Sequence, residues 1–215
     1  MTFTTRFAPS PTGPLHLGHA YSALLAQDMA QAQGGTFLLR IEDIDRQRSK
    51  PVWESGIYDD LAWLGLTWPT PALRQSDRLP AYKDALQWLW SQSLLYPCTC
   101  TRRDIQDAAS APQVVTSPRY GPDGLVFPGT CRETEPRTGK MPENLALRLD
   151  MRDALVRIGR QSFDFEETGS PEPKGFTSAE LIRDVGDIVL SRKDFPGSYH
   201  LSVVLDDADQ DITHV

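Results

Sequence analysis

Apolar and polar positions fall into short blocks over the first 41 residues. An apolar-leaning run at Thr2–Phe7 ends in a turn rich in proline and glycine, and Ala20–Gln33 is rich in good helix formers. Gly34 and Gly35 supply a left-handed end to this helix, and the apolar run Thr36–Ile41 predicts a second strand. Strand, helix and strand at this spacing predict a βαβ unit, in which a crossover helix joins two parallel strands.

The same patterns predict further elements along the rest of the chain. Apolar residues at helical spacing, or a short run of helix formers, predict helices at Val52–Leu64, Leu79–Ser93 and Arg102–Ala109. The proline-rich stretch Ser110–Pro142 is expected to be irregular. Alternating apolar and polar positions predict strands at Leu145–Leu149, Leu155–Ile158 and Val185–Ser191. The periodicity of Tyr199–Asp207 fits neither element clearly.

Composition limits the class of protein. The 215 residues are 40% hydrophobic and 24% charged, as in ordinary globular proteins. No secretory signal precedes the first strand, and no apolar run is long enough to span a membrane. Three cysteines argue against a disulfide framework and for a reducing compartment. We therefore expect a cytoplasmic protein that contacts no membrane.

The net charge of −7 does not favour binding of nucleic acid. The charge is uneven, however: residues 101–160 carry ten Lys and Arg against eight Asp and Glu, whereas residues 161–215 carry four against twelve. A nucleic-acid contact would have to use local basic positions, namely Arg102, Arg103, Arg132 and Arg137.

Candidate chemistry begins in the stretch Arg6–Ala20, which is R-F-A-P-S-P-T-G-P-L-H-L-G-H-A. A strand, a tight loop and a helix start together present backbone N–H groups and a positive dipole end to an anion. Gly18 has no side chain, so a flat ring or a phosphate could lie on its backbone. His16 and His19 flank that glycine and could donate hydrogen bonds to the same oxygens. Alone, such a histidine pair could equally belong to the surface or to the core.

A second stretch, Phe37–Asp45, is an apolar run that ends in the carboxylates Glu42, Asp43 and Asp45. A buried parallel strand has this pattern, and ligands bind at the carboxyl ends of such strands in open α/β sheets. The alternative is a strand followed by a solvated turn.

Together the two stretches resemble the glutamyl branch of the class I aminoacyl-tRNA synthetases. The signatures of that branch are R-F-A-P-S-P-T-G-x-L-H-x-G-H and R-I-E-D-x-D, matched here by Arg6–His19 and Arg40–Asp45. The resemblance implies an α/β fold, a Rossmann-like catalytic domain with an inserted α+β subdomain. The expected domains are residues 1–97 and 195–215 for the catalytic domain and residues 98–194 for the insertion. It also implies that Tyr199–Asp207 is a helix.

The implied reaction joins glutamate to ATP, with Mg²⁺, to give glutamyl-adenylate and pyrophosphate, after which the glutamyl group passes to a tRNA. Such a step needs two anions held in line and donors that stabilise the developing charge. The resemblance implies that His16 and His19 are these catalytic donors. The implied ATP site consists of Pro9, His16, Gly18 and His19.

Glutamate carries two carboxylates and one ammonium, so its site should offer a cation and an anion. Arg6 can hold a carboxylate through two hydrogen bonds, and Glu42 can receive the ammonium. The resemblance implies a glutamate site of Arg6, Ala8, Ser10, Glu42 and Tyr199. Arg6 could instead form a surface ion pair and Tyr199 could be a buried phenol. Asp43 and Asp45 are expected to be structural, through loop hydrogen bonds or pairing with Arg46 or Arg48.

The cysteines suggest a metal site. Cys98, Cys100 and Cys131 are three soft ligands that could hold a tetrahedral Zn²⁺ if a fourth donor is present. Related synthetases carry a tyrosine four residues before the last cysteine, where this chain has Phe127, which cannot bind a metal. Tyr120 or a water could supply the fourth ligand. The alternative is three thiols that hold no metal.

Two subfamilies share these motifs: one charges tRNA(Glu), and the other attaches glutamate to the queuosine base of tRNA(Asp). Pro51 after the second motif, the runs Y-P-C-T-C-T-R-R and P-G-T-C-R, and Val203 in place of an asparagine are similar to the second subfamily. The expected partner is therefore tRNA(Asp) carrying queuosine, with the tRNA(Glu)-charging type as the alternative. We expect a monomer.

The R-G-x-D-L segment and the K-x-S-K-type loop of the branch are absent from these 215 residues. We therefore expect the N-terminal portion of such an enzyme, with an incomplete site and little or no activity. Two other classes of protein share part of this pattern. Small nucleotidyltransferases share H-x-G-H but lack R-I-E-D-x-D and the cysteine-bearing insertion, whereas a domain that binds nucleotide, glutamate or tRNA without turnover stays open.

Overall fold

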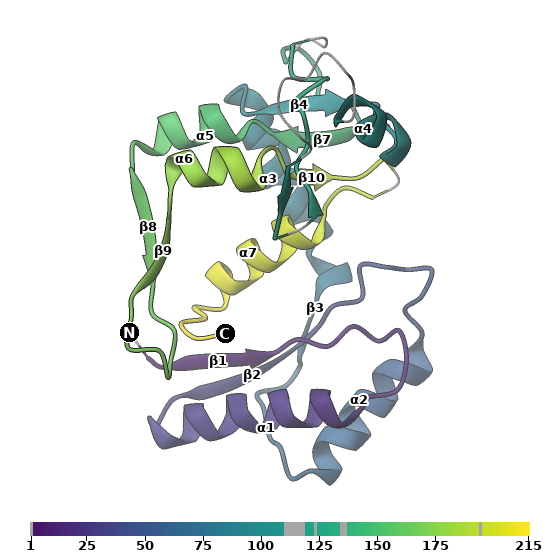
Figure 1. Cartoon of the computed structure of the whole chain (residues 1–215). Helices are drawn as coiled ribbons and strands as arrows, with labels where there is room; N and C mark the ends of the chain where they lie inside the picture. The colour runs from purple at the N-terminus through teal and green to yellow at the C-terminus, as the bar shows by residue number, and fades with distance from the viewer. Residues whose placement is uncertain (1, 110–118, 123, 134–136, 194) are drawn as a thin grey trace. The chain divides into compact units, whose positions relative to one another are not determined.

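The structure, a computed structural model, describes residues 2–109, 119–122, 124–133, 137–193 and 195–215 (Figure 1). Part of the stretch Ser110–Pro142, expected to be irregular, lies outside these residues. The chain forms two compact units: unit 1 consists of residues 1–82 and 202–215, and unit 2 consists of residues 83–201.

Unit 1 is built on three parallel strands in the order β1-β2-β3. The register pairs Arg6 with Leu38 and Phe7 with Leu39. Its elements are β1 (Thr4–Phe7), α1 (Leu17–Ala32), β2 (Thr36–Ile41), α2 (Pro51–Trp63), β3 (Leu73–Arg74), the 3₁₀ turn η1 (Gln75–Arg78), the start of α3 (Leu79–Ser91) and the C-terminal part of α7 (Tyr199–Asp209).

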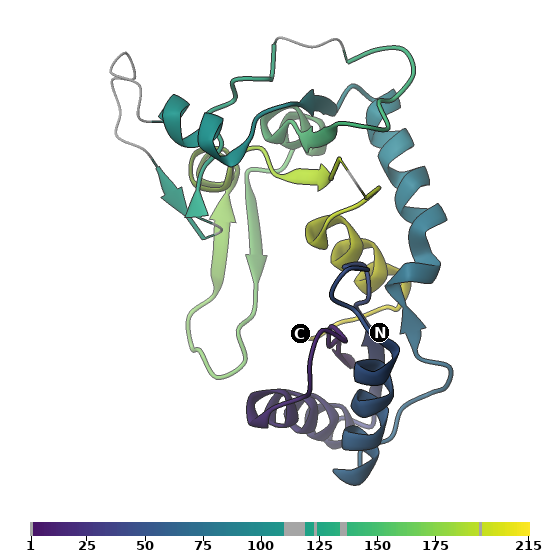
Figure 2. The ribbon, with the colours of Figure 1, turned by 90° about the vertical axis from the view of Figure 1, so that its right-hand side faces the viewer.

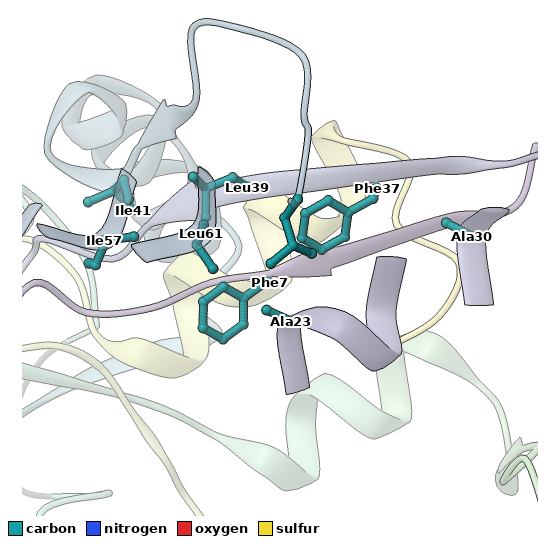
Figure 3. Packing of buried hydrophobic residues seen from close by; sticks show 9 residues of the cluster. Phe7, Ala23, Ala30, Phe37, Leu39, Ile41, Ile57 and Leu61 are labelled. Carbon is teal, nitrogen blue, oxygen red and sulfur yellow. The ribbon is translucent and has the colours of Figure 1, made fainter. Parts of the chain in front are cut away.

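One face of this sheet carries the core of unit 1. Because side chains alternate along a strand, Phe7, Leu39 and Ile41 point to the same face, where helices α1 and α2 cover them. Figure 3 shows these side chains packed against Ala23 of α1 and Ile57 and Leu61 of α2. The alternation places Arg6, Leu38 and Arg40 on the opposite face, where α7 lies (Figure 1).

Unit 2 contains an antiparallel sheet in the order β10-β7-β4 and two separate hairpins, β5-β6 and β8-β9. Figure 2 shows β8 and β9 side by side as an extended ribbon. Its elements are the rest of α3, β4 (Leu95–Cys98), α4 (Arg102–Ala109), β5 (Tyr120–Gly121), β6 (Gly124–Leu125), β7 (Ala146–Leu149), α5 (Met151–Ile158), β8 (Ser162–Phe165), β9 (Lys174–Thr177), α6 (Ser178–Glu180), the π-helical turn η2 (Leu181–Val185), β10 (Val189–Ser191) and the start of α7.

The predicted α/β class and the opening βαβ unit are confirmed. The strand predicted at Leu155–Ile158 is wrong, because these residues end helix α5. Asp150 caps that helix by accepting a hydrogen bond from the backbone N–H of Asp153 at 3.2 Å, and Gly159, with φ of 69°, ends it. The strand predicted at Val185–Ser191 is shorter, since Val185 ends η2 and only Val189–Ser191 pairs with β7.

The limits of the two units differ from the domains predicted from the sequence, 1–97, 98–194 and 195–215, and that domain assignment stays a prediction. Tyr199–Asp207, whose periodicity was ambiguous, lies within helix α7, as the resemblance implies. In the part of the chain that the structure describes, no helix has both the length and the apolar character required to cross a lipid bilayer.

Candidate active site

The N-terminus of α1 presents two stacked histidine rings. His16 is the N-cap of the helix, and its ring centroid lies 3.8 Å from that of His19, with 28° between the planes. His16 Nδ1 accepts a hydrogen bond from the backbone N–H of Gly18 at 3.1 Å, and His19 Nδ1 accepts one from the N–H of His16 at 3.2 Å. The two side chains therefore close a reciprocal capping box, the arrangement more often made by Ser or Thr with Glu.

These hydrogen bonds determine where each ring carries its proton. A neutral imidazole that accepts at Nδ1 carries its proton at Nε2, so both Nε2–H groups remain as donors to a ligand. Burial, and then the neighbouring ring of His16, lower the pKa of His19, so its neutral form dominates at neutral pH. Gly18 lies under His16: a Cβ there would sit 3.1 Å from His16 Cε1. The close approach favours glycine at this position.

The carboxyl ends of β1 and β2 meet beside one another. The backbone N–H of Glu42, directly after β2, donates to the carbonyl of Pro9, two residues after β1, at 3.0 Å. Pro9 and Glu42 are buried, whereas Ser10 is exposed. This edge of a parallel sheet is where ligands bind in α/β proteins.

Arg6 is held by an acidic residue that the sequence analysis did not single out. Its Nε and Nη2 donate to the two carboxylate oxygens of Asp207 on α7, at 2.6 and 3.0 Å. Asp207 Oδ1 also accepts from Nη1 of Arg40 at 2.7 Å, and Arg40 Nη2 donates to Glu42 at 3.3 Å. The four side chains form one network of alternating charge, which we call the Arg6–Glu42 network, with Asp207 and Arg40 inside it.

Burial and pairing set the charge states of this network. Burial raises the pKa of Glu42, and the neighbouring cations Arg40 and Arg6 oppose that rise. Burial would also raise the pKa of Asp207, but hydrogen bonds from Arg6 and Arg40 outweigh it, and the pKa lies below the ordinary value. Asp207 is therefore ionised at neutral pH.

The sequence carries a signal for Arg40 and Asp207, which were not among the predicted site residues. Arg40 is a cation within an apolar strand, and Asp207 belongs to an acid pair that ends an apolar helix segment.

The other predicted residues are placed as follows. Ala8 lies in the loop after β1. Tyr199 is the first residue of α7 and belongs to unit 2, whereas the other predicted glutamate-site residues belong to unit 1. Its role therefore stays a prediction. Asp43 accepts from the backbone N–H of Ser76 at 2.8 Å, and Asp45 pairs with Arg48 at 2.7 Å, which agrees with the structural roles predicted for both.

A cavity of about 640 Å³ in unit 1 lies elsewhere. Thr4 and Thr36, the first residues of β1 and β2, line it, so it is at the amino ends of the strands. It includes Asp207 but none of the predicted site residues. Apart from Asp207, the groups described above come from the carboxyl ends of β1 and β2 and from the start of α1, which we take as the candidate site.

The three cysteines come together in unit 2. Their sulfur atoms all lie within 4.8 Å of one another, and those of Cys100 and Cys131 are 3.2 Å apart. Nε of Arg148 lies 3.3 Å from the sulfur of Cys98, and its guanidinium stacks on the ring of Phe127 at 3.8 Å. Burial raises the pKa of Cys100 to about 11. Three clustered sulfurs beside a cation fit a soft metal such as Zn²⁺.

Tyr120, the tyrosine predicted as a fourth ligand, lies in β5 and is 75% exposed. Phe127 is buried with Tyr96, Cys98 and Cys131, so it packs against the cluster. The role of Tyr120 stays a prediction.

Comparison with known proteins places these features in a family. Residues 2–153 match the family described as tRNA synthetases class I (E and Q), catalytic domain. The chain belongs to this family of class I tRNA synthetases. A relative from Rhodobacter capsulatus, described as glutamyl-Q tRNA(Asp) synthetase, is 59% identical over 98% of this chain and 74% of its own length. A second, from Rhodopirellula baltica and described in the same words, is 38% identical over 98% of this chain and 62% of its own length.

Solved structures of class I tRNA synthetases are similar as well. A glutamate tRNA ligase from Elizabethkingia meningosepticum, in complex with its amino acid, has a TM-score of 0.71 and 25% identity. It is matched over 100% of this chain and 43% of its own. The chain thus spans about two thirds of the length of its curated relatives and less than half of this solved structure.

Proposed function

We propose that this chain carries the glutamate-activating site of a glutamyl-Q tRNA(Asp) synthetase. In the proposed reaction a carboxylate oxygen of glutamate attacks the α-phosphorus of ATP, a P–O bond forms, and the bond to the bridging oxygen breaks to release pyrophosphate. The glutamyl group then passes to the queuosine base of tRNA(Asp), and the acyl–phosphate bond breaks to release AMP. Support comes from relatives up to 59% identical that carry this description, and from the geometry at the carboxyl edge of the sheet.

The observation that carries the proposal is that unit 1 contains both a pair of histidine donors and a pair of opposite charges. At the start of α1, His16 and His19 each accept at Nδ1, which leaves Nε2–H to donate to phosphate oxygens. Preorganised donors of this kind stabilise charge that develops on the phosphoryl group with little reorganisation. At the strand ends, Arg6 supplies a cation and Glu42 an anion, the two charges that a glutamate requires.

The proposed ligand contacts follow from these positions. Gly18 and Pro9 would accommodate the nucleotide beside His16 and His19, with Mg²⁺ bound together with the ATP phosphates as the charge partner of pyrophosphate. Arg6 would hold the side-chain carboxylate of glutamate, and Glu42 the ammonium. Ala8 and Ser10 would complete the part of the glutamate site that unit 1 supplies, and the role of Tyr199 stays a prediction.

We propose that Cys98, Cys100 and Cys131 hold Zn²⁺, with Tyr120 or a water as fourth ligand. A bound Zn²⁺ supplies a covalent link between segments that are far apart in the sequence. Here it would join the end of β4 to the turn at residues 129–132. The guanidinium of Arg148 would offset part of the thiolate charge.

We further infer a monomer that acts in the cytoplasm on tRNA(Asp) carrying queuosine. One observation favours a second candidate: the solved structures that are similar to this chain are described as glutamate tRNA ligases. In that alternative the same site would serve the charging of tRNA(Glu).

Transfer of radiolabelled glutamate separates the two candidates. The chain is incubated with ATP, Mg²⁺ and labelled glutamate. The chain is in excess over tRNA, so that slow transfer is recorded. Three tRNAs are compared: tRNA(Asp) carrying queuosine, an unmodified tRNA(Asp) transcript and tRNA(Glu). Because little activity is expected of these 215 residues, the expected label is weak, and it is on the queuosine-containing tRNA(Asp) alone. Label on tRNA(Glu) would support the alternative and contradict the proposal.

A further inference from the structure

Asp207 stands between the two arginines of the Arg6–Glu42 network. It lies on α7, whereas Arg6 and Arg40 come from β1 and β2. Its Oδ1 is shared, at 2.6 Å from Arg6 Nε and 2.7 Å from Arg40 Nη1, and its Oδ2 lies 3.0 Å from Arg6 Nη2. One carboxylate therefore sets the orientation of one guanidinium through two hydrogen bonds and also binds a second guanidinium.

The arginine between the two acids cannot reorient. The side chain of Arg40 is fully buried, with Nη1 bound to Asp207 and to Gln210 at 3.1 Å and Nη2 bound to Glu42. Two cations and two anions alternate, so the network has no net charge. Removing the charge of Asp207 would leave a buried cation with one acid fewer, which is costly in a medium of low dielectric constant.

Asp207 is itself held by the neighbouring residue. Asp206 is fully buried and accepts hydrogen bonds from Gln75 Nε2 at 2.9 Å and Tyr82 Oη at 2.7 Å. These contacts fix the C-terminal part of α7 against η1 and the start of α3, within unit 1. The carboxylate of Asp207 therefore has a defined place from which to orient Arg6.

We propose that Asp207 is a positioning residue for amino-acid selection: it orients Arg6 toward the side-chain carboxylate of glutamate and couples it through Arg40 to Glu42. The inference rests on the proposed function. A guanidinium fixed at Nε and Nη2 presents a constant direction to a ligand, and a fixed donor discriminates a carboxylate from a carboxamide better than a mobile one. Asp207 would thus contribute to the preference for glutamate over glutamine without touching either.

Calorimetric titration with glutamate, glutamine and ATP tests this. In Asp207→Asn we expect glutamate affinity to fall about tenfold and the preference for glutamate over glutamine to shrink by a similar factor, as for a lost charged hydrogen bond. ATP affinity should stay within about twofold, because sites without shared partners act independently. The matched control is Asp209→Asn, the same change on the same helix at a residue that pairs with Arg78 outside the network.

The outcomes are separable. The inference would be overturned if Asp207→Asn kept the preference for glutamate or lost affinity for glutamate and glutamine equally. Tighter glutamate binding in Asp207→Asn would also overturn it, because that result would show that Asp207 competes with the ligand. Asp207→Glu keeps the negative charge and gives a second test if Asp207→Asn does not fold. The loss of preference for glutamate should be smaller than in Asp207→Asn, and the absence of any loss would contradict the inference. No glutamate binding by the unaltered chain would overturn the proposed function itself.

Discussion

Glu42 illustrates how much of the site depends on the surroundings of single residues. A glutamate carboxyl is ordinarily ionised at neutral pH, and this one lies at the end of a buried strand, where burial raises its pKa and Arg40 and Arg6 limit the rise. The two arginines therefore favour the ionised form of a carboxyl that burial alone would make harder to ionise. Arg6 in turn depends on Asp207. Each residue of the Arg6–Glu42 network is thus oriented by an oppositely charged neighbour.

This dependence predicts how glutamate binding responds to pH. Only ionised Glu42 attracts the ammonium of the ligand, and its raised pKa means that protonation begins at a higher pH than for an ordinary glutamate. Affinity for glutamate should therefore fall as the pH is lowered from neutral toward about 5, with a decline that begins at a higher pH than for an ordinary carboxyl with a pKa of about 4.3. Calorimetry across this range measures the effect.

The control for this experiment is Glu42→Gln, which should bind glutamate more weakly at every pH and show a flat profile in this window. The ligand's own carboxylates are ionised throughout and contribute no slope. An unaltered slope in the variant would assign the titration to another group and would contradict the role given to Glu42.

At the scale of elements, two glycines differ in how much room their surroundings leave for a side chain. Gly35, just before β2, has no room for a side chain: a Cβ would lie 2.1 Å from the carbonyl oxygen of Phe3. That carbonyl accepts a hydrogen bond from Thr36 at 2.8 Å, which starts the pairing of β1 with β2. Gly56, inside α2, has nothing within 4 Å of a Cβ. The two positions should respond to alanine in opposite directions.

Gly35→Ala should lower the free energy of unfolding by about 2 kcal/mol, because a backbone carbonyl must move. Gly56→Ala should raise it by about 0.5–1 kcal/mol, since alanine is the better helix former. Urea denaturation followed by circular dichroism compares both variants with the unaltered chain. A stabilising Gly35→Ala would show that the approach of β1 to the turn before β2 is not tight.

Element patterns also show what the sequence could and could not predict. The helix of the opening βαβ unit lies between a proline-rich turn and Gly34-Gly35, and its existence is confirmed, although it begins at Leu17 and not at the predicted Ala20. Four residues, Leu155–Ile158, were too short a window to distinguish helix from strand, and the capping role of Asp150 decides for the helix. The motifs indicated Arg6 and Glu42, but the Asp207 link depends on a contact 201 residues away along the chain. No local pattern reports such a contact.

At the scale of the whole molecule, the chain separates its chemistry between two units. The Arg6–Glu42 network and the histidine pair belong to unit 1, and the cysteine cluster belongs to unit 2. If Zn²⁺ binds the cluster, it stabilises the segments that carry the three cysteines, because metal-binding free energy contributes directly to local folding. The metal would then support unit 2 without taking part in the reaction.

Removal of the metal should therefore act on one unit only. Elemental analysis of chain purified without chelator should find about one zinc per chain. After chelation, hydrogen exchange should become faster in β4 and in the turn at residues 129–132, with β1, β2 and α1 unchanged. Exchange that rises equally in both units, or chain that contains no metal, would contradict a zinc site at these cysteines.

The central claim is that the carboxyl edge of β1 and β2, with the start of α1, binds both the glutamyl part and the nucleotide part of glutamyl-adenylate. A non-hydrolysable sulfamoyl analogue of glutamyl-adenylate tests it most directly, by calorimetric titration against glutamate, ATP and the glutaminyl analogue. We predict that the glutamyl analogue binds at least about 100-fold more tightly than glutamate or ATP alone, as analogues of bound intermediates do, and more tightly than the glutaminyl analogue. Equal affinity for the two analogues, or none for either, would contradict the account.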